Sequence, residues 1–257
     1  MNQPLFIYFV GTAGSGKSSL TQAFKLWMDR HGFDAVTMNL DPGAESLPYG
    51  PDVDIRDWIS LRQVMDRYSL GPNGAQIISA DLLATKAPEI KEVVDEFKAD
   101  YFLVDTPGQI ELFVFRDCGK YIIDYLSKGR ALIAFLIDSF LAKNPSGLVS
   151  QLLLAVTSLF RLEAPMSSLL SKSDILKDAE RRQILSWCED PDKLYGSITS
   201  SMPTAYKQLS VNLLQVLAEL GAELKPSCIS SENLGGMEDL YTQIQETFMG
   251  GEDLSKD

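Results

Sequence analysis

The sequence has few of the residues that most metal and covalent chemistry requires. Its 257 residues include one histidine, His31, and three cysteines, Cys118, Cys188 and Cys228, which are far apart. No two of these cysteines have the spacing of a metal site, and an odd number of scattered cysteines is typical of a reducing compartment. We therefore do not expect histidine-based metal or triad chemistry, and we place His31 at the surface near the end of a helix.

Basic residues and long apolar runs are also scarce. The chain has 23 Lys and Arg against 35 Asp and Glu, a formal net charge of −12. This balance argues against broad electrostatic binding to nucleic acid or to anionic membranes. The apolar run at residues 5–10 is too short for a signal peptide, and the run at 131–137 is strand-sized. We expect a cytoplasmic protein with no membrane partner and no direct nucleic-acid partner.

Short apolar runs alternate with helical patterns along the chain. Strands are predicted at residues 5–10, 35–40, 101–105, 131–138, 166–170 and 226–229. Helices are predicted at residues 17–31, from Asp57 as a cap to 68, up to 97 with a break near Pro88, and at 116–128, 145–160, 179–188, 203–220 and 237–248. This alternation predicts a parallel sheet covered on both faces, a three-layer α/β/α fold with helical insertions. We expect one domain over residues 1–249 and a polar tail at 250–257.

A glycine-rich loop follows the first predicted strand. Residues 11–18 match the pattern G-x-x-x-x-G-K-[ST], which defines the phosphate loop of P-loop nucleotide-binding proteins. The glycines allow the backbone N–H groups to turn toward an anion. Lys17 would reach the β- and γ-phosphates, and the Ser18 hydroxyl would hold Mg²⁺. The predicted nucleotide-binding residues here are Gly11, Ala13, Gly14, Ser15, Gly16, Lys17, Ser18 and Ser19.

Polar residues also end two other predicted strands. Asp105 ends the strand at 101–105, where a carboxylate can hold Mg²⁺ through its water shell. Gly108 can offer its N–H to a γ-phosphate, and Gln109 can orient an attacking water. Asp41 follows the strand at 35–40, where it could hold water bound to Mg²⁺ or orient the nucleophilic water. The predicted metal site is Ser18, Asp105 and Asp41, and the sequence leaves Asp41 and Gln109 as alternatives for positioning water.

Two further stretches point to guanine and to a rigid catalytic loop. Ser171-Lys172-Ser173-Asp174 is similar to the N/T-K-x-D guanine motif, although it begins with serine. Asp174 would accept hydrogen bonds from N1–H and the N2 amine of guanine, and the Lys172 stem would lie over the base. Residues 230–232 stand where such proteins have a short S-A-x loop. Gly71-Pro72-Asn73 predicts a rigid turn whose Asn73 amide can donate to developing charge.

Together these motifs resemble the GPN-loop GTPases over most of the chain, to about residue 248, and the compact length is more similar to archaeal members. The resemblance implies binding of GTP and GDP with Mg²⁺ in a homodimer whose two nucleotide sites face each other. It implies that Asp41, Asp105, Gln109 and Glu111 line the hydrolytic site. It also implies that Asn73 acts in trans near the γ-phosphate. Eukaryotic relatives suggest client proteins such as RNA polymerase subunits.

Other classes of nucleotide-binding protein remain as alternatives. MinD-like ATPases use a second lysine early in the phosphate loop as their trans element, and this chain has Thr12 there. A small-molecule kinase would need an acceptor site and an arginine-rich lid, and neither can be located in the sequence. A nucleotide-gated assembly factor with incidental turnover is the third class. We expect a Mg²⁺-dependent GTPase that switches conformation within a homodimer.

Overall fold

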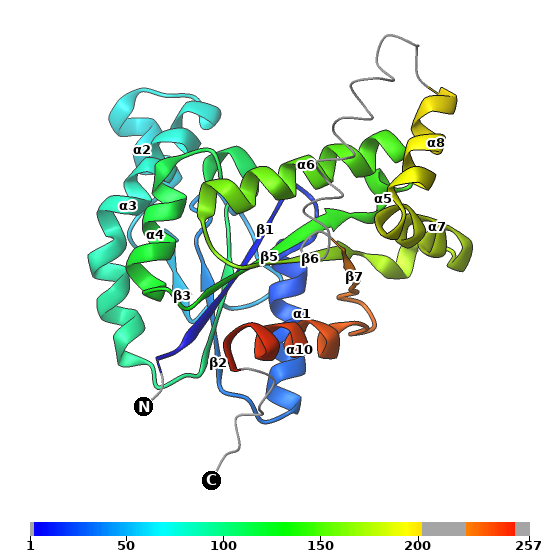
Figure 1. Ribbon diagram of the computed structural model, residues 1–257. Coiled ribbons are helices and arrows are strands. Elements are labelled where there is room, and N and C mark those ends of the chain that lie inside the picture. The colour runs from blue at the N-terminus through cyan, green and yellow to red at the C-terminus, as the bar shows by residue number, and fades with distance from the viewer. Residues whose placement is uncertain (1–2, 202–224, 250–257) are drawn as a thin grey trace.

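The computed structural model describes residues 3–201 and 225–249, which contain one seven-stranded sheet (Figure 1). The strand order is β3-β2-β4-β1-β5-β6-β7, and every neighbouring pair is parallel. The strands are β1 (Leu5–Gly11), β2 (Ala35–Asn39), β3 (Val53–Asp54), β4 (Tyr101–Asp105), β5 (Ala131–Asp138), β6 (Met166–Ser171) and β7 (Ser227–Cys228). The expected parallel sheet is confirmed, and β3 is an addition to it.

Helices cover both faces of this sheet. They are α1 (Lys17–Arg30), α2 (Leu61–Tyr68), α3 (Pro72–Glu96), α4 (Asp117–Ser127), α5 (Ser139–Ala142), α6 (Pro145–Leu162), α7 (Asp178–Glu189), α8 (Pro191–Ser201) and α10 (Met237–Met249). Helices α1 and α10 pack on one face, and α3, α4 and α6 pack on the other (Figure 1). The three-layer α/β/α fold is therefore confirmed.

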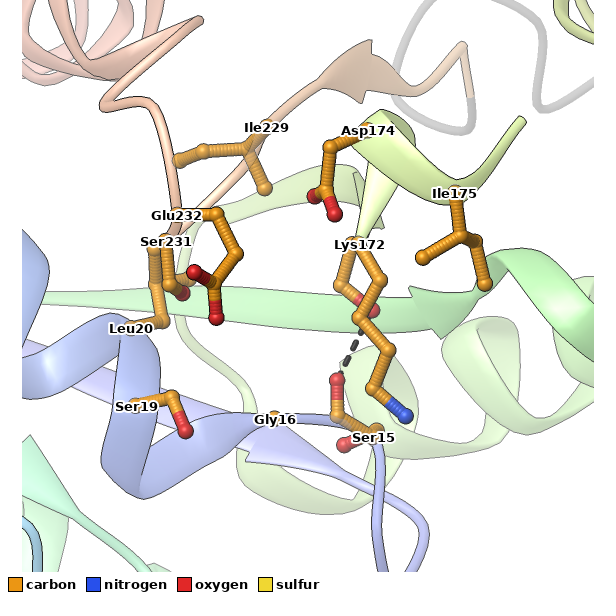
Figure 2. A pocket seen from close by; sticks show the side chains of 11 residues that line it. Ser15, Gly16, Ser19, Leu20, Lys172, Asp174, Ile175, Ile229, Ser231 and Glu232 are labelled. Atoms are coloured by element: carbon orange, nitrogen blue, oxygen red, sulfur yellow. Dashed lines mark hydrogen bonds between the residues drawn. The ribbon is translucent and has the colours of Figure 1, made fainter. Parts of the chain in front are cut away.

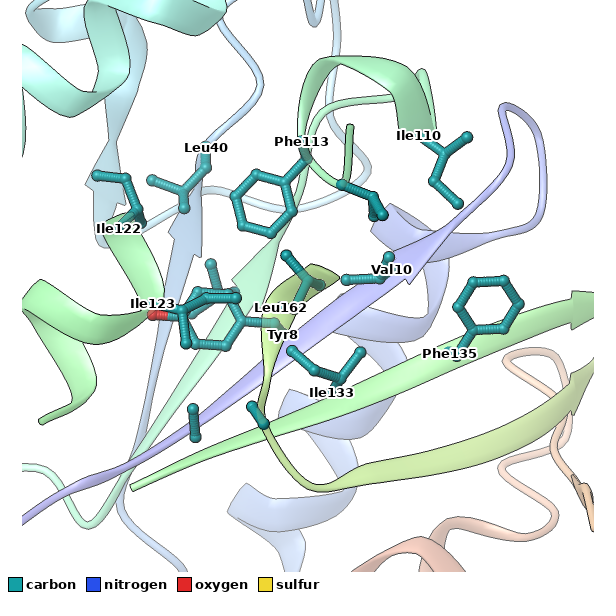
Figure 3. Close-up of a cluster of buried hydrophobic side chains, with 14 of the residues drawn as sticks. Tyr8, Val10, Leu40, Ile110, Phe113, Ile122, Ile123, Ile133, Phe135 and Leu162 are labelled. Atoms are coloured by element: carbon teal, nitrogen blue, oxygen red, sulfur yellow. The ribbon is translucent and has the colours of Figure 1, made fainter. Parts of the chain in front are cut away.

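The central strand β1 shows how the sequence produces the two cores. All its residues are buried, as in a parallel strand covered on both faces. Leu5, Ile7 and Phe9 belong to the core under α1 and α10. Phe6, Tyr8 and Val10 belong to the larger core on the opposite face, because successive side chains of a strand point to opposite sides. Figure 3 shows part of this second core, with Tyr8 and Val10 among its members.

The segment before α3 differs most from the sequence-based expectation. Asp57 does not cap a helix, since it ends a 3₁₀ helix, Ile55–Asp57, and α2 begins only at Leu61. Ser60 caps α2 instead, accepting a hydrogen bond from Gln63 N at 3.4 Å. The turn predicted at residues 71–74 is also wrong. Pro72 is the first residue of α3, a position that suits proline because its missing N–H needs no partner there.

The break predicted in α3 near Pro88 is wrong as well. The helix continues to Glu96, with Pro88 exposed and its neighbours Ala87 and Ile90 buried in the core. Tertiary packing of the buried face therefore outweighs the local cost of the proline. The sequence pattern of α4 predicts that Cys118, Ile122 and Tyr125 share one face of the helix. Cys118 and Ile122 are buried, whereas Tyr125 is exposed and stacks on Tyr121, so it is not on that face.

The C-terminal part confirms some predictions and leaves others untested. The strand at 226–229 and the helix at 237–248 correspond to β7 and α10, whereas α8 was not expected. The predicted helix at 203–220 and the tail at 250–257 lie outside the described residues. Within the described residues, α6 alone is long and apolar enough to cross a membrane. Its residues Leu148, Leu152 and Ala155 are buried in the core on one face of the sheet, whereas Phe160 is exposed.

Candidate nucleotide site

The phosphate loop, residues 11–18, joins β1 to α1 and folds back tightly on itself. Gly16 has φ 101°, a left-handed conformation that glycine adopts without strain. A Cβ added at Gly11 would lie 2.7 Å from Ser15 Oγ and 2.9 Å from the Leu136 carbonyl oxygen, so no larger residue fits there. Helix α1 has no side-chain cap and no acidic residue in its first turn. Its N-terminal dipole and N–H groups can therefore bind an anion.

Lys17 lies inside the curl of this loop. Its Nζ donates to the carbonyl oxygens of Gly11 at 3.0 Å, Thr12 at 3.1 Å and Gly108 at 2.9 Å. These three bonds use all the donors of an ammonium group. Burial lowers the pKa of Lys17, and the nearby carboxylates of Asp105 and Asp41 oppose that shift. A phosphate that enters the loop must therefore replace one or more of these carbonyl oxygens to accept a hydrogen bond from Lys17.

Asp105 ends β4 beneath the phosphate loop, and its side chain is buried. Tyr49 donates to Asp105 Oδ2 at 3.2 Å, whereas Oδ1 has no hydrogen-bond partner among the described residues. Burial raises the pKa of Asp105 to about 6, against the opposing effects of Ser18 and Lys17. An unpartnered buried oxygen is costly unless a donor or cation reaches it. Asp105 and Ser18 thus fit the oxygen-rich environment that Mg²⁺ prefers.

Other ligands of such an ion would be water and phosphate. No group of three or more His, Cys, Asp or Glu side chains suited to a metal occurs within residues 3–201 and 225–249. Mg²⁺ usually keeps several waters and binds through one or two carboxylates plus substrate phosphates. Of the three predicted metal residues, Ser18 and Asp105 are consistent with that mode of binding, whereas both carboxylate oxygens of Asp41 accept from backbone N–H groups.

Asp41 lies in the loop after β2 and contacts the loop after β4. Its Oδ1 accepts from Gly43 N at 2.8 Å and its Oδ2 accepts from Gly108 N at 2.7 Å. Asp41 also lines a cavity of about 290 Å³ together with Gly14, Gly16, Lys17, Ser18, Ser19, Thr106, Gly108 and Lys172. The structure thus brings Asp41 to the phosphate loop, but with both carboxylate oxygens bound to backbone N–H groups.

A second cavity, of about 220 Å³, shares Gly16, Ser19 and Lys172 with the first. Figure 2 shows Asp174 and Glu232 pointing into it from either side, above Gly16 and Ser19. Ser230 Oγ donates to Asp174 Oδ1 at 2.6 Å and so fixes the orientation of that carboxylate. The loop at residues 230–232, whose match to the expected pattern is incomplete, is therefore part of this cavity.

Ser171, the position that departs from the guanine motif, has a structural role. Its Oγ donates to the carbonyl oxygen of Ser15 at 2.8 Å and lies 3.2 Å from that of Ile137. The hydroxyl therefore ties the end of β6 to the phosphate loop. The serine maintains the geometry between the two loops although it is neither Asn nor Thr.

Lys172 connects the two cavities. Its Nζ donates to the Gly14 carbonyl oxygen at 2.5 Å and to Asp138 Oδ2 at 2.8 Å. A Cβ added at Gly16 would lie 3.6 Å from Lys172 Cε, so the lysine stem passes over the phosphate loop. Sequence reasoning missed Asp138, which ends β5 as Asp105 ends β4, and it missed Tyr49. The position of a carboxylate at the end of a central strand could have indicated Asp138.

Six predicted residues line neither cavity, and two of them, Gly11 and Asp105, are buried. Gln109 and Glu111 are exposed at the start of the 3₁₀ helix Ile110–Leu112, and Ala13 is exposed in the phosphate loop. Asn73 is exposed in the first turn of α3. A Cβ added at Gly43 would lie 3.2 Å from Gln76 Nε2, so this end of α3 packs beside the Asp41 loop. The roles predicted for Gln109, Glu111 and Asn73 remain predictions.

The two cavities share Gly16, Ser19 and Lys172. One molecule with an anionic part and a planar part can therefore occupy both.

Comparisons with known proteins also indicate a nucleotide-binding protein. A family model described as "Conserved hypothetical ATP binding protein" matches residues 9–250. A GPN-loop GTPase of Pyrococcus abyssi is 30% identical over 253 residues, which cover 98% of this chain and 100% of that protein.

The chain belongs to the GPN-loop GTPases. The structure of this chain is similar to the crystal structure of a GTPase in apo form from Pyrococcus abyssi, with a TM-score of 0.83 at 30% sequence identity. The match covers 94% of this chain and 96% of the Pyrococcus chain. The fold is thus a P-loop α/β fold. GPN-loop GTPase 1 of Dictyostelium discoideum is 30% identical over 245 residues, and this chain spans only 61% of its length.

Proposed function

We propose that this chain binds GTP with Mg²⁺ and hydrolyses it to GDP and phosphate. The preference for guanine is proposed from the position of Asp174 at the edge of the second cavity. Ser230 Oγ donates to Asp174 Oδ1 at 2.6 Å and so orients this carboxylate. One oxygen of Asp174 accepts from Ser230, and the carboxylate keeps free acceptor positions toward the cavity. Guanine presents two donors, N1–H and the N2 amine, on one edge, and adenine lacks that pair. A site built around such acceptors discriminates strongly against a base without the donors.

The phosphates of GTP are proposed to bind in the first cavity. Lys17 and the N-terminal N–H groups of α1 would neutralise their charge. Mg²⁺ held by Ser18 and Asp105 would supply further positive charge at the phosphate oxygens. Water attacks the γ-phosphate in line, and either Asp41 or Gln109 positions it, with Glu111 near the hydrolytic site.

The active unit is proposed to be a homodimer in which Asn73 of one subunit serves the site of the other. Two features support this proposal. Thr12 stands where MinD-like ATPases have their trans-acting lysine, so another donor is needed. Asn73 is exposed at the start of α3, close to the loop that carries Asp41. A cytoplasmic role in assembling protein complexes, with clients such as RNA polymerase subunits, is carried as part of this proposal from the family resemblance alone.

Steady-state hydrolysis of GTP and of ATP, measured over a range of protein concentrations, tests this function. We expect GTP to be preferred, and we expect activity per subunit to rise with concentration until the dimer is saturated. Equal turnover of ATP would contradict the role of Asp174. Activity per subunit that stays constant far below the dimer dissociation constant would show that each site is complete alone, which would contradict the shared active site.

Replacing Asn73 with alanine is expected to lower kcat for GTP by about a hundredfold while KM changes little, since the amide would act on charge that develops in the transition state. A mixing experiment tests the trans role. An Asn73→Ala subunit keeps Lys17, and a Lys17→Ala subunit keeps Asn73, so the mixed dimer contains one complete site. Activity of the mixture well above that of either variant alone supports action in trans. A mixture no more active than its components would contradict the action of Asn73 in trans.

A further inference from the structure

Asp41 accepts a hydrogen bond from the Gly108 N–H group, the donor that a third phosphate would need. Gly108 N donates to Asp41 Oδ2 at 2.7 Å, and the second carboxylate oxygen accepts from Gly43 N at 2.8 Å. Hydrogen bonds from N–H groups to a carboxylate are short and about twice as strong as neutral ones. The carboxylate thus takes the position of an anion at the backbone of Gly108.

Gly108 is held from its other side by the lysine of the phosphate loop. Lys17 Nζ donates to the Gly108 carbonyl oxygen at 2.9 Å, in addition to its two bonds within the loop. Both groups that the sequence assigns to the γ-phosphate, Lys17 and the Gly108 N–H, are therefore engaged within the protein. The N-terminus of α1 has no side-chain cap and stays available for phosphates. A diphosphate can use that N-terminus without disturbing Gly108.

Charge makes the competition between Asp41 and a third phosphate severe. Asp41 lines the same cavity of about 290 Å³ as Lys17, Ser18 and Gly108. A γ-phosphate that bonded to the Gly108 N–H would bring its negative oxygens against the Asp41 carboxylate, and like charges in a partly buried site repel strongly. The triphosphate can bind Gly108 only if Asp41 moves away, and the lost hydrogen bonds count against that state.

We propose that Asp41 sets the preference of this site between GDP and GTP by holding Gly108 in place of a third phosphate. This inference rests on the proposed function, since it concerns guanine nucleotides in the same site. It assigns Asp41 a role in discriminating between the diphosphate and the triphosphate. That role differs from positioning water or holding Mg²⁺, and it predicts an effect on affinity of the opposite sign.

The test compares the dissociation constants of GDP and of a non-hydrolysable GTP analogue at a constant, saturating Mg²⁺ concentration. They are measured for the full chain and for Asp41→Asn, Asp41→Ala and Glu45→Gln by competition with a fluorescent guanine nucleotide. In both Asp41 variants we expect the ratio of the analogue Kd to the GDP Kd to fall at least tenfold, with GDP affinity little changed. Glu45 is an exposed acid on the same loop, so Glu45→Gln removes one charge nearby and should leave the ratio unchanged.

The remaining outcomes separate this inference from the proposed function. The inference is overturned if the ratio of the analogue Kd to the GDP Kd is unchanged or higher in the Asp41 variants. Weaker binding of the analogue would instead indicate that Asp41 holds Mg²⁺ or water when the triphosphate is bound. Retained GDP binding shows that a variant is folded, and Asp41→Asn decides the result if Asp41→Ala does not bind GDP. Failure of the unchanged protein to bind either guanine nucleotide would overturn the proposed function itself.

Discussion

Replacing Asp174 with asparagine is expected to change the preferred base from guanine to xanthine. The asparagine amide offers one acceptor and one NH₂ donor where the carboxylate offers acceptors only. Facing guanine, the amide would pair at most one of the two donors. Xanthine has a carbonyl at C2, which the NH₂ group can reach. We expect affinity for GTP to fall about a thousandfold, since hydrogen bonds to a charged group are each worth about 1.5–3 kcal/mol.

Competition of GTP, XTP and ATP for the site measures this change. Asp178→Asn is the matched control, because Asp178 is exposed in the first turn of α7 and pairs with Arg181 rather than lining the cavity. This control should keep the guanine preference. An Asp174→Asn protein that still prefers GTP would show that the base does not contact Asp174, and the cavity in Figure 2 would then need another ligand.

Replacing Asp105 with asparagine is expected to stabilise the nucleotide-free protein and to abolish its Mg²⁺-dependent turnover. Burial raises the pKa of Asp105 from 3.8 to about 6, so the folded state binds this proton more tightly than the unfolded state. The associated stability is fully present below about pH 4 and is lost as the pH rises through about 6. At neutral pH the buried charge costs about 3 kcal/mol, which an asparagine would not incur.

Denaturant unfolding between pH 4 and pH 8, without metal or nucleotide, measures the stability part. The variant should gain stability at pH 7–8 and should lack the decline between pH 4 and pH 6 that Asp105 contributes. Asp52→Asn is the control, because Asp52 accepts from Thr37 N and Thr37 Oγ1, both at 2.8 Å, and its loss should not stabilise the protein. GTP turnover in Asp105→Asn should no longer respond to Mg²⁺. A less stable variant with normal Mg²⁺ stimulation would contradict the assignment.

The fold was predictable where the sequence pattern reflects burial on both faces of a sheet. The apolar runs at 101–105 and 131–138 became β4 and β5 with the predicted bounds, because continuous apolar runs of this length are typical of central parallel strands. The errors concern local preferences that packing overrides. A break in the helix was predicted near Pro88, but the buried neighbours Ala87 and Ile90 hold α3 together.

The site was predictable where its chemistry depends on residues adjacent in the chain. The phosphate loop was identified in this way, because a turn with two left-handed glycines followed by a helix N-terminus is encoded in eight consecutive positions. The loop around Asp174, which is proposed to bind the base, was predicted from four consecutive residues and lines the second cavity. Ser230, which donates to Asp174, lies 56 positions further along the chain. Its loop, residues 230–232, matches the expected S-A-x pattern only in part.

The sequence by itself determined the phosphate loop, its lysine and the position of Asp174, the carboxylate proposed to bind the base. Only the tertiary structure decided which side chains those groups meet. Asp41 pairs with Gly108 across 67 positions, Tyr49 with Asp105 across 56 and Lys172 with Asp138 across 34. The physical reason is the strand order β2-β4-β1-β5-β6, which places the carboxyl ends of parallel strands along one edge of the sheet. Residues distant in the chain therefore meet there, and their contacts follow from the order of strands rather than from local sequence.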